Sequence, residues 1–245
     1  MIFPSGITEG LVVVAGTTNC GKSRVLRNLI HRYLLGLTRC RPKRRPHLIT
    51  FEDPVEVHFQ EKGVNLDEAR SIDYTPREKD KNDVDGKSLR ECLNDALRQT
   101  PAAVYVGETR DKDDWKTLLD FAGTGHLVFT TCHAGSLQET IAPILRSTGS
   151  DTGASRSLVA ARLVAAVHLR KFHFASNLGN PQEASVPTVW TARQGAGLRL
   201  VGSGLSSVLP DGRGCIGRTQ FAQKLDPAAS DDLLKQCLRS DLEGR

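Results

Sequence analysis

The eight residues from Gly16 to Ser23 constrain this chain more than any other part of it. They fit the pattern G-x-x-x-x-G-K-[ST], follow the apolar run 11–15, and lead into apolar positions spaced three and four apart. A buried strand, a glycine-rich turn and an amphipathic helix are the setting in which this pattern folds as a phosphate-binding P-loop. The alternative is a glycine-rich turn without a ligand. The filled signature positions and their correct flanks favour the P-loop.

The pattern assigns chemistry to its residues. Glycines let the backbone fold around phosphate oxygens, and the N–H groups at the helix start point at them. Lys22 is expected to reach the β- and γ-phosphates, and Ser23 to supply a hydroxyl to Mg²⁺. We therefore predict that ATP and Mg²⁺ bind here. The predicted cofactor-binding residues are Gly16, Thr17, Thr18, Asn19, Cys20, Gly21, Lys22, Ser23 and Arg24.

Length and composition restrict the class of protein. A chain of 245 residues, 25% of them charged, can bury one or two soluble cores, and its net charge of +5 suits nucleotides, nucleic acid or acidic lipid without choosing among them. The six cysteines include no C-x-x-C pair, which argues against a zinc ribbon and a disulfide framework and fits a reducing cytoplasm. Cys20 has two interpretations: a thiol activated by the helix dipole, or a small side chain that faces away from the ligand.

Apolar runs alternate with helical patterns in the first part of the chain. The predicted strands are 11–15, 47–51, 103–107 and 127–131, and the predicted helices are 22–37, 88–98 and 112–122. Such alternation is typical of an α/β fold with a mostly parallel sheet flanked by helices. The P-loop then lies at the carboxyl end of the first strand, where such sheets bind ligands.

The other segments are less regular. The polar segment 60–87 has no sustained apolar period and is expected to form a long surface excursion. From about residue 173 Gly, Ser and Pro dominate, so we divide the chain into a core domain at 1–172 and a small irregular α+β extension at 173–245. The elements predicted in the extension are two strands and a final helix, at 186–191, 198–201 and 227–242.

Polar residues follow three of the predicted strands. Glu52 and Asp53 follow the second strand, Glu108 follows the third and His133 follows the fourth. Placed at the carboxyl ends of parallel strands, a carboxylate faces the nucleotide and can position the attacking water. Taken singly, each of them has an ordinary structural explanation that is equally good. Glu52 and Asp53 can belong to a solvated turn, Glu108 can be a surface residue, and His133 can be structural.

Four blocks taken together resemble the secretion ATPase superfamily, which includes the motors of type II secretion and of type IV pilus retraction. The blocks are the P-loop, an acidic box at 51–56, a Gly-Glu box at 107–111 and a histidine box at 125–133. The likeness covers residues 8–192 and implies a RecA-like P-loop ATPase that works as a ring, usually a hexamer, beside the inner-membrane platform protein of a pilus or secretion machine. A cytoplasmic location, peripheral to the inner membrane, follows from the same resemblance.

The resemblance also implies roles for three residues. Glu108 is the main catalytic acid and contacts the metal through water, Glu52 is an assisting acid, and His133 reports the nucleotide state. Family members usually carry an N-terminal domain, whereas ten residues precede the first strand here. Two expectations stay open: a minimal homologue, or a partner domain on a separate polypeptide that completes the site.

Two other functions stay open. One is a nucleotide-binding assembly or regulatory subunit that hydrolyses little without a partner. The other is a nucleic-acid-linked ATPase, suggested by the basic loop 39–45, which is more simply a solvated loop. An aromatic content of 5% offers few surfaces on which bases can stack, so we rank nucleic acid last.

Overall fold

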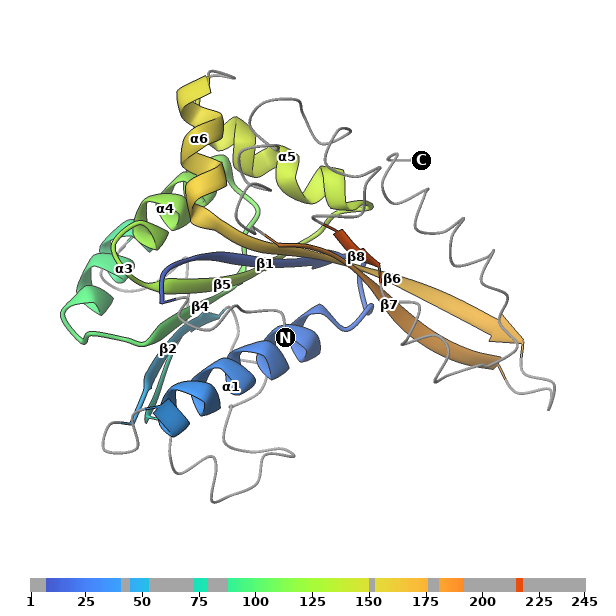
Figure 1. The fold of residues 1–245 in the computed structure, drawn as a ribbon, viewed down its shortest axis with the longest axis horizontal. Helices are drawn as coiled ribbons and strands as arrows, with labels where there is room; N and C mark the ends of the chain where they lie inside the picture. The colour runs from blue at the N-terminus through green and yellow to red at the C-terminus, as the bar shows by residue number, and fades with distance from the viewer. Residues whose placement is uncertain are drawn as a thin grey trace. The chain divides into compact units, whose positions relative to one another are not determined.

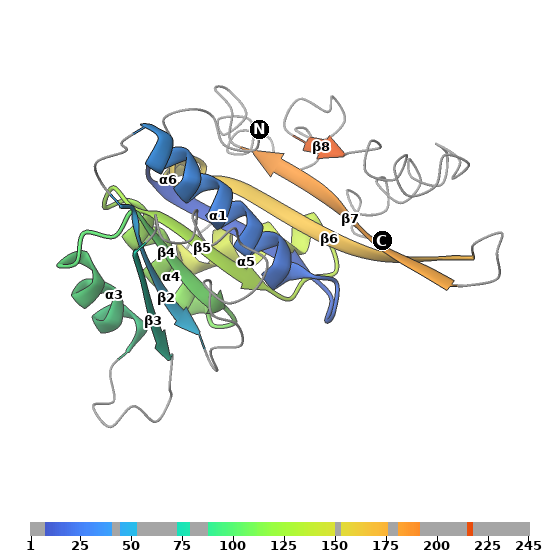
Figure 2. The same ribbon diagram turned by 90° about the horizontal axis from the view of Figure 1, so that it is seen from below.

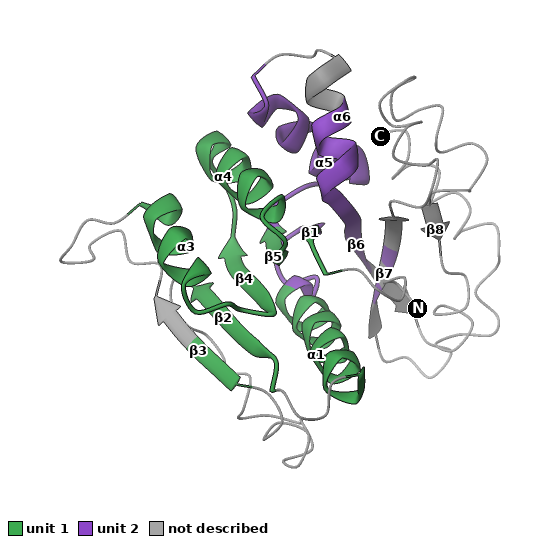
Figure 3. Ribbon diagram, turned by 60° about the vertical axis from the view of Figure 1, so that its left-hand side comes forward, with its two compact units in different colours: residues 1–12, 23–131 green, residues 13–22, 132–245 purple. Residues whose placement is uncertain are grey.

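The computed structural model describes residues 8–40, 45–52, 73–78, 88–149, 153–175, 181–191 and 215–217. Asp53 and the elements predicted at 198–201 and 227–242 lie outside these ranges. The chain divides into two compact units, of which unit 1 comprises residues 1–12 and 23–131, and unit 2 comprises residues 13–22 and 132–245 (Figure 3).

Unit 1 is built on parallel strands in the order β3-β2-β4-β5. These strands are β2 (His47–Glu52), β3 (Asp73–Glu78), β4 (Ala103–Glu108) and β5 (Leu127–Cys132), and the unit also holds residues 10–12 of β1 (Gly10–Gly16). Strand β2 pairs in parallel with β3 and β4, and β4 pairs in parallel with β5. Strands β1, β4 and β5 are nearly continuous apolar runs, as strands covered on both faces usually are.

Helices cover both faces of this sheet. Figures 1 and 2 show α1 (Lys22–Cys40) on one face, and α3 (Leu89–Leu97) and α4 (Lys112–Ala122) on the other. The buried positions of α1 recur every three to four residues, because that spacing keeps side chains on one side of a helix. Ser88 and Glu91 form a capping box that starts α3. The predicted α/β class, with a mostly parallel sheet and flanking helices, is confirmed.

Unit 2 contains an antiparallel set of strands. After the end of β1 come β6 (Leu163–Ala175), β7 (Pro181–Thr191) and β8 (Cys215–Gly217), with β6 antiparallel to β7 and β7 antiparallel to β8. Helices α5 (Leu137–Ser147) and α6 (Gly153–Arg162) pack against β6 (Figure 1). The strand predicted at 186–191 lies within β7. The division at residue 172 stays a prediction.

Strand β3 corrects the interpretation of residues 60–87 as a surface excursion. Its sequence DYTPRE has no apolar run, because it lies at the end of the strand order and pairs with β2 alone among the described strands. Pro76, which lacks an N–H donor, is tolerated at such an edge. A pattern that searches for buried strands therefore does not detect it.

Four further elements, α5, α6, β6 and β8, have no counterpart among the sequence predictions. Pro143 lies inside α5, where proline removes a helical hydrogen bond and argues against a helix. Ser136 accepts a hydrogen bond from the Glu139 N–H at 3.1 Å and caps α5, a signal that the sequence did carry. The apolar start of β6, at 163–167, was a second such signal.

Candidate functional site

The segment from Gly16 to Lys22 forms the turn between β1 and α1. At Gly16, where φ is +150°, a Cβ would lie 2.5 Å from the Leu169 carbonyl oxygen and 2.6 Å from the Cys20 Sγ, so no larger residue fits. Gly21 has open space around it, and its φ of +89° is what selects glycine. The two signature glycines are thus required for different reasons, one steric and one conformational.

The side chain of Lys22 folds back over this turn. Its Nζ donates hydrogen bonds to the carbonyl oxygens of Thr17, at 2.9 Å, and Gly16, at 3.2 Å. Lys22 is also the first residue of α1, and the first N–H groups of a helix have no partner within it. An ammonium group and helical N–H groups at one turn are an arrangement that suits phosphate oxygens.

The remaining P-loop side chains differ in exposure. Thr17, Thr18 and Asn19 are exposed, as is Arg24, whereas Ser23 is half-buried. Cys20 is 1% exposed, and its sulfur lies against Gly16. The thiol therefore faces the interior of the turn, which favours the second interpretation of Cys20.

Glu52 and Glu108 end neighbouring strands of unit 1. The register pairs Phe51 with Val106, and a Cβ added at Gly107 would lie 3.4 Å from the Cα of Glu52. Glycine at position 107 therefore leaves space beside the Glu52 side chain. Glu52 is 3% exposed, whereas Glu108 is half-buried. The structure brings the two predicted acids to the same end of β2 and β4.

Each of these carboxylates binds an arginine that the sequence analysis did not single out. Arg27 of α1 donates from Nη2 to the Glu52 Oε2 at 3.3 Å, and the two side chains are 18% and 4% exposed. Arg110 donates from Nη2 to the Glu108 Oε2 at 2.7 Å, and those side chains are 75% and 27% exposed. The sequence carried little signal for Arg27, which lies beside the apolar positions of α1.

Three threonines hold the backbone around Glu108. The Thr131 hydroxyl donates to the Gly107 carbonyl oxygen, and the Thr109 N–H donates to the Thr131 carbonyl oxygen at 2.9 Å. The hydroxyls of Thr109 and Thr130, both buried, lie 2.6 Å apart. The register between β4 and β5 shifts between Val106 and Glu108, an irregularity that re-aims side chains at functional sites. These bonds set the direction in which β4 presents Glu108.

The histidine box contributes two different environments. His133 is exposed directly after β5 and belongs to unit 2. His126 precedes β5, its Nδ1 lies 3.1 Å from the Thr124 hydroxyl, and its ring centroid lies 5.3 Å from that of Phe121. Burial lowers the pKa of His126 below its usual value, and a hydrogen bond from the ring to the Thr124 backbone opposes this in part.

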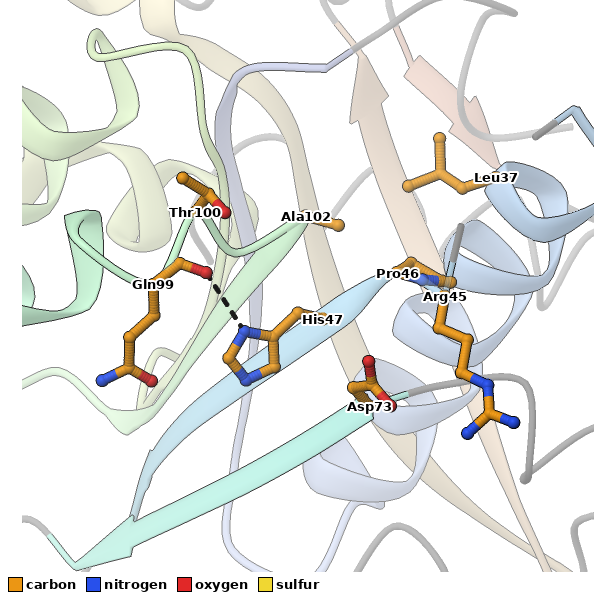
Figure 4. Close-up of a pocket in the computed structure, with 8 residues that line it drawn as sticks. All are labelled: Leu37, Arg45, Pro46, His47, Asp73, Gln99, Thr100 and Ala102. Carbon is orange, nitrogen blue, oxygen red and sulfur yellow. Dashed lines mark hydrogen bonds between the residues drawn. The ribbon is translucent and has the colours of Figure 1, made fainter. Parts of the chain in front are cut away.

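A cavity of about 590 Å³ lies at the opposite end of the strands of unit 1 (Figure 4). His47 and Asp73, the first residues of β2 and β3, line it, and the His47 Nδ1 lies 3.4 Å from the Gln99 carbonyl oxygen. Since a six-residue strand spans about 17 Å, this cavity is separate from Glu52 at the end of β2.

A comparison with protein families shows to which family the chain belongs. The profile described as "Type II/IV secretion system protein" matches residues 7–191. The chain belongs to this family. It is 36% identical over 139 residues to the type IV pilus retractation ATPase PilT of Pseudomonas aeruginosa, an alignment that covers 56% of this chain and 35% of that protein. It is 31% identical over 128 residues to the type II secretion system protein E of the same organism, with 52% and 21% covered.

The chain thus spans about a third, or less, of the length of these curated relatives. Among solved structures, it resembles the ATPase DotB of Legionella pneumophila with a TM-score of 0.69 and 17% identity, covering 97% of this chain and 62% of that one. It resembles the pilus retraction motor PilT with bound ADP with a TM-score of 0.63 and 24% identity, covering 93% and 64%. At these identities the likeness shows the RecA-like fold. No helix within the described ranges is both long and apolar enough to cross a bilayer.

Proposed function

We propose that this chain binds ATP with Mg²⁺ and hydrolyses it as a motor subunit of a type IV pilus or type II/IV secretion-like machine. The observation that carries the proposal is the P-loop of a type II/IV secretion family member, with Lys22 held over the turn by two carbonyl oxygens. The named relatives are pilus and secretion proteins, and one structural neighbour holds ADP.

Nucleotide binding follows from the P-loop residues. Lys22 exchanges its bonds to the Gly16 and Thr17 carbonyl oxygens for bonds to phosphate oxygens, and the first N–H groups of α1 bind the same anion. The Ser23 hydroxyl and the Glu108 carboxylate are oxygen donors of the kind that Mg²⁺ prefers, with Glu108 acting through water. When bound, Mg²⁺ neutralises phosphate charge.

Hydrolysis requires a group that accepts a proton from the attacking water. We assign this role to Glu108: the water oxygen bonds to the γ-phosphorus, the bond to the β–γ bridging oxygen breaks, and the water proton goes to the Glu108 carboxylate. The bulge and the threonine bonds around Glu108 support this role, because they aim one carboxylate. Glu52 assists as a buried acceptor, and exposed His133 is proposed to report the nucleotide state.

Assembly is part of the same proposal. We propose a homo-oligomeric ring, a hexamer as in the family, that works at the cytoplasmic side of the inner membrane with a platform protein. Mass in solution with and without a non-hydrolysable ATP analogue tests this proposal, since a nucleotide-dependent hexamer supports it and a monomer in both conditions contradicts the ring.

The test of the chemistry compares three variants. Lys22→Ala is expected to abolish binding of a fluorescent ATP analogue, and Glu108→Gln to keep that binding but lose phosphate release. Lys112→Ala, which changes an exposed lysine of α4, is the matched control and is expected to behave as the wild type. Binding with no phosphate release by the wild type would instead favour the alternative, a nucleotide-binding assembly or regulatory subunit.

A further inference from the structure

The proposed function does not explain how the carboxylate of Glu52 is stabilised in a buried position. It is 3% exposed at the end of β2, and a buried carboxylate is costly unless a partner neutralises it. The partner is Arg27, which reaches Glu52 from α1, 25 positions away in sequence. Glu52 and Glu108, the two acids at this sheet end, therefore lie in different electrostatic environments.

Other ionisable residues lie on the elements beside Glu52. Glu108 follows Gly107 on β4, so the strand beside β2 contributes a second acid at this sheet end. His31 lies one turn beyond Arg27 on α1, and its Nε2 is buried without a hydrogen-bond partner within the described ranges. Among the hydrogen bonds described for Glu52, the one from Arg27 is the charged one.

The position of Arg27 along α1 relates it to the P-loop. Arg27 lies four residues after Ser23, so the two lie on the same side of α1, about one turn apart. The helix that begins with the P-loop lysine thus also carries the cation that binds Glu52.

We propose that Arg27 is a positioning residue that holds Glu52 as an ionised, immobile hydrogen-bond acceptor. This inference rests on the proposed function, in which Glu52 assists the attack of water. The contact with Arg27 favours the ionised form of Glu52 and so makes this carboxylate a weaker base. Glu52 therefore orients the water or a metal-bound water and does not take its proton. Proton transfer then falls to Glu108, whose own arginine is exposed and easily displaced.

The first experiment measures phosphate release against pH for the whole chain with ATP and Mg²⁺. Arg27→Ala is expected to lower kcat by about 10- to 100-fold with little change in KM, the cost of a misplaced group. It is also expected to move the acidic limb of the kcat profile toward neutral pH, because Glu52 without its cation is more readily protonated. Arg27→Lys is expected to restore part of kcat and to return the limb toward its wild-type position.

Two further variants separate positioning from a structural role. Arg32→Ala, which changes an exposed arginine of the same helix, is expected to leave both kcat and the limb unchanged. The double variant Arg27→Ala/Glu52→Gln is expected to match Glu52→Gln alone, because the effects of one interacting pair do not add. An unmoved limb or additive losses in folded protein would overturn the proposal.

A second measurement does not depend on turnover. Carbon-13 NMR of the Glu52 carboxyl is expected to give a higher titration midpoint in Arg27→Ala than in the wild type, with no such change in Arg32→Ala. Equal midpoints would refute the role of Arg27. If the wild type releases no phosphate but the midpoints differ, the pairing stands and the proposed function fails.

Discussion

Two carboxylate–arginine pairs lie at the same end of neighbouring strands and differ in almost every physical respect. Arg110 and Glu108 are 2.7 Å apart and two positions apart in sequence, and the arginine is 75% exposed. Arg27 and Glu52 are 3.3 Å apart, come from different elements and are largely buried. The shorter pair is the weaker one, because water screens exposed charges. Burial, more than distance, is therefore expected to decide which of the two pairs contributes more to stability.

This difference suits different tasks in the proposed reaction. Arg110 is exposed and can leave Glu108 at little cost, which suits the proposed role of that carboxylate as a proton acceptor. Arg27 and Glu52 are largely buried, so separating them is expected to cost more, which suits the proposed role of Glu52 as a fixed acceptor. The following predictions test this contrast.

The largest expected effect is on turnover. Glu108→Gln is expected to lower kcat by about 10²–10⁴-fold, since it removes the proposed proton acceptor. Glu52→Gln is expected to lower kcat less, by about 10- to 100-fold, since the amide keeps an oxygen acceptor in place. Phosphate release at saturating ATP measures both values. An equal loss in the two variants would remove the proposed division of roles.

Stability is expected to show the opposite order. Arg27→Ala is expected to lower the free energy of unfolding by about 3–5 kcal/mol, because it leaves a buried carboxylate without its cation. Arg110→Ala is expected to change it by about 0–1 kcal/mol, as exposed pairs do. Urea unfolding followed by circular dichroism gives both numbers, with Arg32→Ala as the surface control. A larger loss for Arg110→Ala would mean that burial does not rank the pairs.

Salt is expected to separate the pairs by a smaller margin. Raising ionic strength from about 0.01 M to 1 M shortens the Debye length from about 30 Å to 3 Å, which screens exposed charges most. The stability difference between the wild type and Arg110→Ala is therefore expected to vanish at high salt, whereas that for Arg27→Ala persists. Urea unfolding repeated at both salt concentrations measures this, and parallel changes would contradict it.

The smallest expected effect concerns a titratable group whose described hydrogen bond is to a neutral partner. Burial lowers the pKa of His126 in the folded state, so below about pH 6.5 the unfolded chain binds a proton more readily. Stability from this group is therefore complete above that pH and is lost as the pH falls through the window between the unfolded and the folded pKa. His126→Gln is expected to lose less stability than the wild type between pH 7.5 and 5.5. Thermal unfolding at the two pH values measures the difference, and identical losses would count against it.

Local patterns predicted a large part of the fold. The strand, turn and helix around the P-loop lie where the sequence placed them, although α1 continues to Cys40, past the predicted end at residue 37. The long apolar strands of unit 1 were predicted for the same reason, because burial on both faces requires apolar runs. Strand β3 was not, since a polar edge strand is defined by its pairing with β2. The proposed roles of Glu52, Glu108 and His133 stay predictions.

Local sequence was enough to predict the P-loop turn and the acids that end two strands. Both depend on near neighbours: glycine conformation at positions 16 and 21, and strands that end in an acid. The contact of Arg27 with Glu52 and the inward-facing Cys20 thiol became visible only in the folded chain. Burial and the ion pair between α1 and β2 depend on how distant segments pack, which no local spacing encodes.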